Sequence, residues 1–382
     1  MKVLLLKNYA PDRQFSMLAY AQMLERALPK SGCEVATVTP PVFFGRGRNT
    51  ASGLGKWMGY LDKYILAWAK TRKAVKEFQP DIVHICDHSN AMYLPLFSKF
   101  PSVLCCHDLL AIKVWLGEIP GQCKSRTGGL QQQWIFSGIK KAPAILCVSS
   151  KTHDDLRRLA PDISADTRVI PMGLNYPFQR IDEAEADRRI VESREIKSLS
   201  GNAISGNWVL HVGNDSWYKN RAGALNIFRA ASECSEHNLN MLFVGEPPSE
   251  EMLRNAHGLE NSIAFIQDVS NELLEALYRK AICLLFPSLA EGYGWPPIEA
   301  QACGCPIVVS DIEPLRSNCK DALFIDPKAE ALAGRQLAEL LADEPRLEQL
   351  STDGLKNAER FTAEQMIAHY YKFYCDIISA NR

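Results

Sequence analysis

Short apolar runs alternate with helix-like segments along the whole chain, and this alternation constrains the fold more than any other feature. It is typical of βαβ units, in which helices join parallel strands of one sheet. The 382 residues exceed the size of an ordinary domain, so two successive doubly wound parallel sheets fit better than one large sheet. We predict an α/β fold with strands at Val3–Leu6, Glu34–Val38, Asp81–Ile85, Ser102–Cys105, Ala144–Val148, Arg168–Ile170, Trp208–Val212, Asn240–Val244, Ser262–Ile266, Ile282–Phe286, Pro306–Val309 and Ala322–Ile325.

A polar, charged segment divides the chain near its middle. Strand and helix patterning stops at about residues 175–206, so we expect the linker between two domains there. This places an N-terminal domain at 1–185 and a C-terminal domain at 200–360. Residues 361–382 repeat apolar side chains at helical spacing, and such a helix needs a groove to bury its stripe. We expect it to cross back to the N-terminal domain.

Charge is unevenly divided, although the formal net charge is only −1. Residues 1–180 carry 24 Lys and Arg against 13 Asp and Glu, a net +11, and the remainder carries −12. A basic half attracts anionic partners, which a phosphorylated small molecule, a membrane surface or a nucleic acid would each satisfy. The charges are spread over strands and helices with no recognisable nucleic-acid module, so we expect no nucleic-acid binding.

The cysteines and the N-terminal run bear on the location of the protein. The twelve cysteines include no C-x-x-C pair, and half of them lie in or beside apolar runs, where a free thiol packs as a small hydrophobe. The opening apolar run is too short for a secretory signal, and no run approaches the ~20 residues of a membrane span. We expect reduced cysteines and a cytoplasmic protein, with a peripheral contact at the inner face of the membrane left open.

Residues 56–78 form a long amphipathic segment that has two interpretations. Lysines recur every seven residues on one side, at 56, 63 and 70. A core helix with a solvated basic side is the simpler interpretation, and a basic helix with aromatic anchors that lies on an anionic membrane is the other. The apolar residues expected to share one face are Trp57, Leu61, Tyr64, Ile65, Trp68 and Val75.

The densest chemical signal is the run E-G-Y-G-W-P-P-I-E, from Glu291 to Glu299, which follows a predicted buried strand. Glycines let backbone N–H groups approach a ligand, and the two prolines suit the first turn of a helix, whose N–H groups attract anions. A loop of this kind after a parallel strand faces the edge where such sheets bind ligands. Ionised carboxylates are acceptors only, so two of them suit a ligand rich in hydroxyl groups.

This run resembles the E-x7-E motif of the retaining family-4 glycosyltransferases, the glycosyl transferases group 1, which have the GT-B fold. That fold consists of two Rossmann-like domains facing a central cleft. The resemblance extends over nearly the whole chain, because other segments resemble family motifs in the same order. They are CCHDL (105–109), CVSSKTHDDL (147–156), PMGLN (171–175), HVGNDSWYKN (211–220) and ERF (359–361).

The resemblance implies roles for individual residues. Lys219 matches the lysine that binds the donor diphosphate. Glu299 matches the carboxylate that accepts hydrogen bonds from the ribose hydroxyls, and Glu291 matches the carboxylate at the sugar. His107 matches the first-domain histidine at the sugar, with Asp108 beside it on the acceptor side. The residues expected to act in catalysis are therefore Glu291, Lys219 and His107. The other expected donor-binding residues are Gly213, Asn214, Asn220, Gly292, Tyr293 and Gly294.

Two departures from the family pattern concern phosphate contacts. Tyr218 stands where the family commonly has an arginine before the lysine, so we expect Arg221 or another basic residue to replace that cation. The loop after the first strand carries no glycine from Asn8 to Met17, where the family has a Gly-Gly-like contact. A first helix that starts near Ser16 would still present its N–H groups.

The resemblance implies transfer of a sugar from a UDP- or GDP-sugar to an acceptor hydroxyl, with retention of anomeric configuration, in glycan, polysaccharide or glycolipid synthesis. No resident cofactor and no metal site are expected, because an ammonium group and loop N–H groups can stabilise the leaving phosphate. A phosphorylase- or epimerase-like enzyme of this fold and a catalytically silent nucleotide-sugar-binding partner are the alternatives. The first domain of the fold binds the acceptor, so its basic charge predicts an anionic or lipid-linked acceptor.

Overall fold

The computed structural model describes residues 1–46, 53–123, 125–197, 208–236 and 238–381, which form two compact units. The N-terminal unit contains residues 1–175 together with 362–382, and the C-terminal unit contains residues 176–361. Residues just after 175 pack on the second unit: the backbone N–H of Gln179 donates to Glu275 at 2.9 Å, and the guanidinium of Arg279 donates to the carbonyl of Ile181 at 3.0 Å. The first unit therefore ends ten residues before the expected boundary at 185. Residues 198–207 of the expected linker lie outside the described residues.

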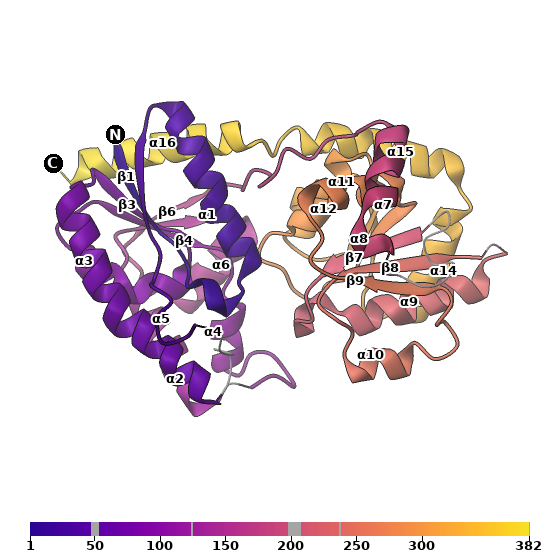
Figure 1. The fold of residues 1–382 in the computed structure, drawn as a ribbon, viewed down its shortest axis with the longest axis horizontal. Coiled ribbons are helices and arrows are strands. Elements are labelled where there is room, and N and C mark those ends of the chain that lie inside the picture. Colours follow the sequence, from indigo (N-terminus) through magenta and orange to yellow (C-terminus); the bar gives the residue numbers. More distant parts are fainter. Residues whose placement is uncertain (47–52, 124, 198–207, 237, 382) are drawn as a thin grey trace. The chain divides into compact units, whose positions relative to one another are not determined.

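The N-terminal unit is built on a six-stranded parallel sheet of order β2-β1-β3-β4-β5-β6. Figure 1 labels β1, β3, β4 and β6 of this sheet. All six strands predicted for the first half are present. The inner strands are buried runs, whereas the two edge strands, Glu34–Val38 and Asp166–Val169, are partly polar and exposed. The bounds of the six strands are β1 (Lys2–Leu6), β2 (Glu34–Val38), β3 (Ile82–Ile85), β4 (Ser102–Cys106), β5 (Ala144–Cys147) and β6 (Asp166–Val169).

Helices cover both faces of this sheet, as the doubly wound pattern predicts. Several begin at a side-chain cap: Ser149 accepts from the backbone N–H of Thr152 at the start of α6, and Ser125 accepts from Gly128 at the start of α5. The helices of the unit are η1 (Ala10–Asp12), α1 (Phe15–Ala27), η2 (Leu28–Ser31), α2 (Gly53–Leu61), η3 (Asp62–Leu66), α3 (Ala67–Phe78), η4 (His88–Phe97), α4 (Leu110–Trp115), α5 (Arg126–Ile139), α6 (Ser150–Leu159) and α16 (Ala363–Ala380).

The C-terminal unit repeats the plan with a second six-stranded parallel sheet, of order β12-β11-β10-β7-β8-β9. The six strands predicted for the second half are again present. They are β7 (Trp208–Gly213), β8 (Asn240–Gly245), β9 (Ile263–Ile266), β10 (Cys283–Phe286), β11 (Ile307–Ser310) and β12 (Leu323–Ile325). The helices are α7 (Glu183–Glu192), α8 (Arg194–Lys197), η6 (Trp217–Lys219), α9 (Arg221–Cys234), α10 (Glu250–Asn255), α11 (Asn271–Lys280), α12 (Trp295–Ala302), α13 (Leu315–Asn318), α14 (Glu330–Leu341) and α15 (Glu344–Ala358).

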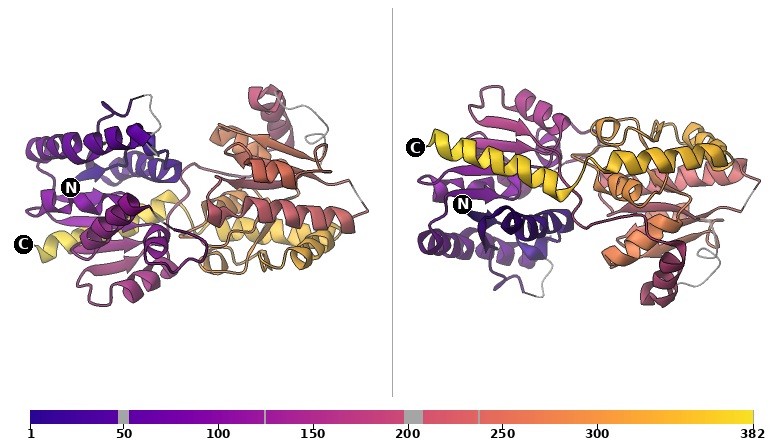
Figure 2. Two further views of the ribbon diagram at one scale, coloured as in Figure 1. Left: turned by 90° about the horizontal axis from the view of Figure 1, so that it is seen from below. Right: turned by 90° about the horizontal axis from the view of Figure 1, so that it is seen from above.

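The last helix, α16, packs on the N-terminal unit, and Figure 2 shows it in yellow lying across that unit. A buried polar network fixes it: His84 on β3 contacts the hydroxyl of Tyr374 at 2.6 Å and that of Tyr20 at 3.1 Å, and Tyr20 contacts Tyr370 at 3.0 Å. Every polar side chain in the network has a partner, which offsets the cost of burying it. The helix stripe buried in this way is Met366, Ile367, Tyr370, Phe373, Tyr374 and Ile377.

The helical segment 56–78 is present and meets the simpler interpretation only in part: Val75 lies in the core with Tyr64 and Trp68 packed against it, whereas Trp57, Leu61 and Ile65 face outward. It runs as α2, a π-helical turn η3, and α3, and its buried positions in α2 and η3 are small or polar: Gly55, Gly59 and Asp62. Trp57 and Ile65 are each 60% exposed. The six apolar residues expected on one face are thus divided between the core and the surface, a division that their spacing does not show.

Two further facts concern cysteines and membrane spans. All twelve cysteines are free thiols, and nine of them are buried. Among the described residues, no helix combines the length and the hydropathy that crossing a bilayer requires.

Candidate functional site

The candidate site of the C-terminal unit lies where two loops follow neighbouring strands. β7 and β10 are adjacent and parallel, so the loops at their carboxyl ends meet at one edge of the sheet, the edge that binds ligands in folds of this class. Two hydrogen bonds tie the loops together. The backbone N–H of Leu289 donates to the carbonyl of Tyr218 at 2.7 Å, and the side-chain amide of Asn220 donates to the carbonyl of Pro287 at 3.0 Å.

Lys219 and Glu291 form a buried ion pair between these loops. The ammonium Nζ of Lys219 lies 2.7 Å from Oε1 of Glu291, and their side chains are only 14% and 6% exposed. The ammonium also lies 4.8 Å from the centre of the Phe286 ring at the end of β10. A buried charge needs a partner of this kind, because its removal from water is costly. The pair therefore holds one cation and one carboxylate at the carboxyl edge of the sheet.

The Gly-Tyr-Gly segment leads from Glu291 into α12. Gly294 has φ of 88°, and a Cβ atom there would lie 2.6 Å from Cδ2 of Leu315, so both the backbone and the packing require glycine. The carbonyl of Tyr293 accepts from the side-chain amide of Asn318 at 2.8 Å. The loop is thus fixed from both sides, and it delivers the first turn of α12 to the same edge of the sheet. That turn, with prolines at 296 and 297, starts at Trp295.

Glu299 lies inside α12 and is 6% exposed. Its Oε2 accepts from the hydroxyl of Tyr278 on α11 at 3.0 Å. Burial raises the pKa of Glu299 to about 7, while the charge of Lys219 and the bond from Tyr278 act in the opposite direction. The sequence analysis did not identify Tyr278, because a tyrosine on an amphipathic helix reads as an ordinary core residue.

The remaining donor-side residues cluster around Lys219. Gly213 ends β7, and the position of its absent Cβ lies 3.6 Å from the Lys219 side chain. Asn214 accepts from the backbone N–H of Ser216 at 3.3 Å and so shapes the loop. Asn220 has a left-handed backbone with φ of 52°, which asparagine tolerates better than most residues.

The contacts of Arg221 argue against its expected role as the replacement for the missing arginine. Its guanidinium is 98% buried and donates to the carbonyls of Glu246 at 2.8 Å and Pro247 at 3.3 Å, both in the loop after β8. Burial lowers the pKa of Arg221. The guanidinium N–H groups of Arg221 donate to backbone carbonyls of the loop after β8. Arg221 therefore fixes that loop, which lies beside the loop that carries Lys219.

In the N-terminal unit, His107 follows β4 and is 4% exposed. Its Nε2 lies 2.8 Å from the carbonyl of Cys86, and a carbonyl only accepts, so Nε2 carries the hydrogen. Nδ1 is then an acceptor, and it is buried without a hydrogen-bond partner among the described residues. Burial lowers the pKa of His107, which favours the neutral ring. Asp108 accepts from the backbone N–H of Leu110 at 2.9 Å and so fixes the turn that leads into α4.

The loop after β1, which lacks the expected glycines, is held by a buried polar cluster that sequence reasoning missed. The amide of Asn8 donates to Asp87, which follows β3, and its carbonyl accepts from Asn90 at 2.9 Å. The first α-helix, α1, begins at Phe15, one residue before the expected start. In the described part of the chain, no group of three or more His, Cys, Asp or Glu side chains is placed to bind a metal ion.

Comparison with family models gives a match for each half of the chain. Residues 19–176 match the model described as Glycosyltransferase Family 4, and residues 194–357 match the model described as Glycosyl transferases group 1. The two matches fall on the two compact units.

Curated relatives are similar over parts of their length. O-antigen chain mannosyltransferase B of Escherichia coli is 33% identical over 235 residues, which are 60% of this chain and 60% of that protein. O-antigen chain mannosyltransferase RfbU of Salmonella typhimurium is 41% identical over 73 residues, 19% of this chain and 21% of that protein. D-inositol 3-phosphate glycosyltransferase of Salinispora tropica is 24% identical over 156 residues, which are 38% of this chain and 32% of that protein. The chain thus spans less than two thirds of each.

Solved structures match the fold over the whole chain. Sucrose-phosphate synthase from Thermosynechococcus elongatus has a TM-score of 0.75 at 18% identity, with all of both chains covered. The catalytic domain of starch synthase IV from Arabidopsis thaliana has a TM-score of 0.70 at 14% identity, with 99% of both chains covered. The resemblance inferred from the motifs is confirmed by these findings: the chain belongs to the glycosyl transferases group 1 family and has the GT-B fold.

Proposed function

We propose that this protein is a glycosyltransferase that moves a sugar from a nucleoside-diphosphate sugar to an acceptor hydroxyl. The observation that carries the proposal is the Lys219–Glu291 pair, buried at the carboxyl edge of the sheet beside the glycine loop that enters α12. Family membership supports the reaction class. The pair supplies a cation for the diphosphate and a carboxylate for the sugar at the same edge of the sheet.

The chemistry follows from the charge that develops as the sugar–phosphate bond breaks. Negative charge appears on the departing phosphate oxygen and positive charge on the sugar ring. The Lys219 ammonium stabilises the phosphate oxygen, together with backbone N–H groups of residues 292–294. Glu291 orients that ammonium in the empty site and accepts from a sugar hydroxyl in the loaded one.

Glu299 is proposed to bind the ribose hydroxyls as an acceptor. Its burial and the hydrogen bond from Tyr278 place the carboxyl group in one orientation before the donor arrives. In the N-terminal unit, the Nδ1 atom of His107 is proposed to accept from a hydroxyl of the transferred sugar, because it is a buried acceptor that needs a donor.

Retention of configuration and independence of metal ions are part of the proposal. With an ammonium and amide N–H groups at the diphosphate, the leaving group is stabilised without a divalent cation. The departing phosphate takes the proton of the acceptor hydroxyl as the new glycosidic bond forms on the same face. Full activity in excess EDTA and a product with unchanged anomeric configuration by NMR are expected, and loss of activity in EDTA or inversion would contradict these two points.

Mannose is the first sugar to test, as a GDP- or UDP-linked donor, since two of the relatives above are named mannosyltransferases. We propose an anionic or lipid-linked glycan acceptor, because the first 180 residues carry the net charge of +11. We further propose a role in glycan, polysaccharide or glycolipid synthesis, in the cytoplasm and with peripheral contact at the inner face of the membrane.

The test is a panel of UDP- and GDP-sugars against the wild-type chain and the Lys219→Met variant. A ligand that binds only the native state raises the melting temperature. The proposal predicts that one donor stabilises the wild type and is hydrolysed slowly without acceptor, and that Lys219→Met weakens both effects. The Lys320→Met variant, on the same unit, is the matched control. A panel in which no nucleotide sugar binds would contradict the proposal.

A further inference from the structure

The outward face of α2 and η3 carries an apolar stripe that no other element of the described chain covers. Four large side chains are spaced three, four and four residues apart, which brings them to one side of a helix. Their exposed fractions are 63% for Leu54, 60% for Trp57, 37% for Leu61 and 60% for Ile65. Large exposed apolar patches are uncommon on soluble proteins, and they mark surfaces that bind another protein or a membrane.

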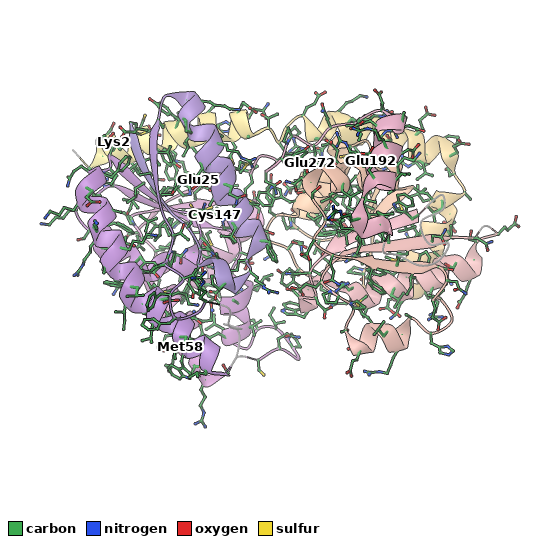
Figure 3. The ribbon with its side chains drawn as sticks, viewed as in Figure 1. Lys2, Glu25, Met58, Cys147, Glu192 and Glu272 are labelled. Carbon is green, nitrogen blue, oxygen red and sulfur yellow. The ribbon has the colours of Figure 1, made fainter. Side chains whose placement is uncertain are left out.

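The neighbouring helix α5 extends the stripe into a patch. Trp134 of α5 is 43% exposed, and its ring centre lies 5.1 Å from that of Tyr64. Leu130, one turn earlier on α5, is 66% exposed. Tyr64, Tyr60 and Trp57 continue as successive ring contacts at 5.2 and 5.7 Å. We call Leu54, Trp57, Leu61, Ile65, Leu130 and Trp134 the apolar patch; Figure 3 marks its helix α2 by the label Met58.

The inward side of the same helix explains why the patch faces outward. Gly55 and Gly59 are buried and bring the helix backbone close to the unit, and the buried carboxylate of Asp62 accepts from the backbone N–H groups of Phe44 at 3.0 Å and Gly45 at 2.9 Å. Asp62 also accepts from the hydroxyl of Tyr9 at 2.6 Å. These contacts fix the rotation of the helix, so the large apolar residues cannot turn inward without breaking them.

The helical segment that carries the patch is rich in basic residues. Between residues 53 and 78 there are six Lys and Arg and two acidic residues, of which Asp62 is buried, and residues 126–141 of the α5 region contain no acidic residue. A shallow cavity of about 340 Å³ lies at the patch between Lys56, Trp57, Tyr60 and Thr127. The ammonium of Lys56 donates to the Thr127 hydroxyl at 3.2 Å and pairs with no carboxylate among the described residues.

We propose that this surface docks the protein on an anionic lipid bilayer, with the apolar patch in the acyl–headgroup boundary and Lys56 at a lipid phosphate in the cavity. Exposed aromatic and aliphatic residues on a lysine-rich helical segment are the composition of helices that lie in the interfacial plane of a membrane. The excess of Lys and Arg in residues 53–78 favours anionic over neutral lipid. The inference is independent of the donor chemistry, because it uses only the N-terminal unit.

The experiment measures sedimentation of the full chain with vesicles of phosphatidylcholine alone and with 30% phosphatidylglycerol. The wild type is expected to bind the anionic vesicles at least about tenfold more tightly, with affinity that falls as salt rises. The triple variant Trp57→Ser/Leu61→Ser/Ile65→Ser is expected to lose at least about tenfold of that affinity. Lys56→Glu is expected to weaken binding to anionic vesicles only.

Matched control variants test whether loss of any exposed apolar side chain weakens vesicle binding. Leu253→Ser on α10 and Leu332→Ser on α14 remove side chains of similar exposure, 55% and 49%, from the C-terminal unit and are expected to bind vesicles as the wild type does. Thermal stabilisation by nucleotide sugars, measured without vesicles, reports on the donor site separately. Equal binding to both vesicle types, or undiminished binding of the triple variant, would overturn the proposal. So would a dimer in sedimentation velocity that the triple variant abolishes, since the patch would then join two copies.

Discussion

The ammonium of Lys219 lies 2.7 Å from a carboxylate oxygen of Glu291, although 72 positions separate the two residues in the chain. One residue ends the short helix η6 after β7, and the other follows β10, and the pairing of these two strands brings the loops together. The pair thus depends on the strand order of the sheet. It also means that each partner stabilises the other in the empty protein, so changes at this pair affect both folding and donor binding.

Removing one partner should cost more stability than removing both. Glu291→Leu leaves the Lys219 ammonium buried and unpaired, so the free energy of unfolding should fall by about 3 kcal/mol. The double variant Lys219→Met/Glu291→Leu should regain most of that loss, because no charge remains buried, and still fail to bind donor. Urea unfolding and donor titration measure the two effects. A double variant that loses the sum of both single losses would argue against the buried pair.

Stability should depend on pH through Glu299. Its pKa is raised to about 7, above the ordinary 4.5, so the native state holds the proton more tightly than the unfolded chain. The contribution is complete below about pH 4.5 and is lost as pH rises to about 7, which amounts to about 3 kcal/mol. Glu299→Gln should abolish this loss and melt at a higher temperature than the wild type at pH 8. Melting curves of both proteins that run parallel from pH 5 to 8 would be the contrary result.

Donor affinity should show the opposite trend, because only the ionised Glu299 accepts hydrogen bonds with both oxygens from the ribose. Affinity should rise as pH increases through about 7, and Tyr278→Phe should weaken donor binding by about threefold to tenfold by releasing the carboxyl group from its orientation. Calorimetric titration at pH 6 and pH 8 checks this. Affinity that does not change with pH in the wild type would remove Glu299 from the ribose site.

Glycine at 294 should be required by both backbone and packing. Gly294→Ala places a Cβ 2.6 Å from Leu315 in a left-handed conformation, so a loss of about 3 kcal/mol is expected. Gly117→Ala is the matched control: its φ is 76°, but nothing lies within 4 Å of the added atom. That variant should lose only about 1 kcal/mol. Chemical denaturation distinguishes the two, and equal losses would mean that the contact with Leu315 is relieved without cost.

The anchoring of α16 should depend on Tyr374. Tyr374→Phe removes the 2.6 Å contact with His84 and leaves a buried ring nitrogen without a partner, which should cost about 1–3 kcal/mol. Tyr371→Phe, on the exposed side of the same helix, should change the free energy of unfolding by less than about 0.5 kcal/mol. Donor binding should be unaffected by both. Equal stability of the two variants would show that the His84 network does not hold the helix.

The sequence predicts the strands well and the site only in outline. Apolar runs locate the inner strands, because strands covered on both faces are largely apolar, whereas the edge strand β6 reads Asp-Thr-Arg-Val and is located by the alternation of strands and helices. The order of the strands, which brings the loop of Lys219 to that of Glu291, is a tertiary property that no local pattern contains. The role of Tyr278 is not predicted for the same reason, because no local pattern shows that its hydroxyl reaches Glu299. Periodicity predicts one apolar face for residues 56–78, but the buried glycines of α2 direct Trp57 and Ile65 outward, while Val75 of the same predicted face lies in the core.

The most direct measurement is calorimetric titration of a nucleoside diphosphate and the matching nucleoside into the wild type and Lys219→Met. If the ammonium of Lys219 grips the pyrophosphate, the variant should bind the diphosphate at least about tenfold more weakly, the loss expected for a charge-assisted contact, and bind the nucleoside as the wild type does. Equal affinity of both proteins for the diphosphate would contradict the account.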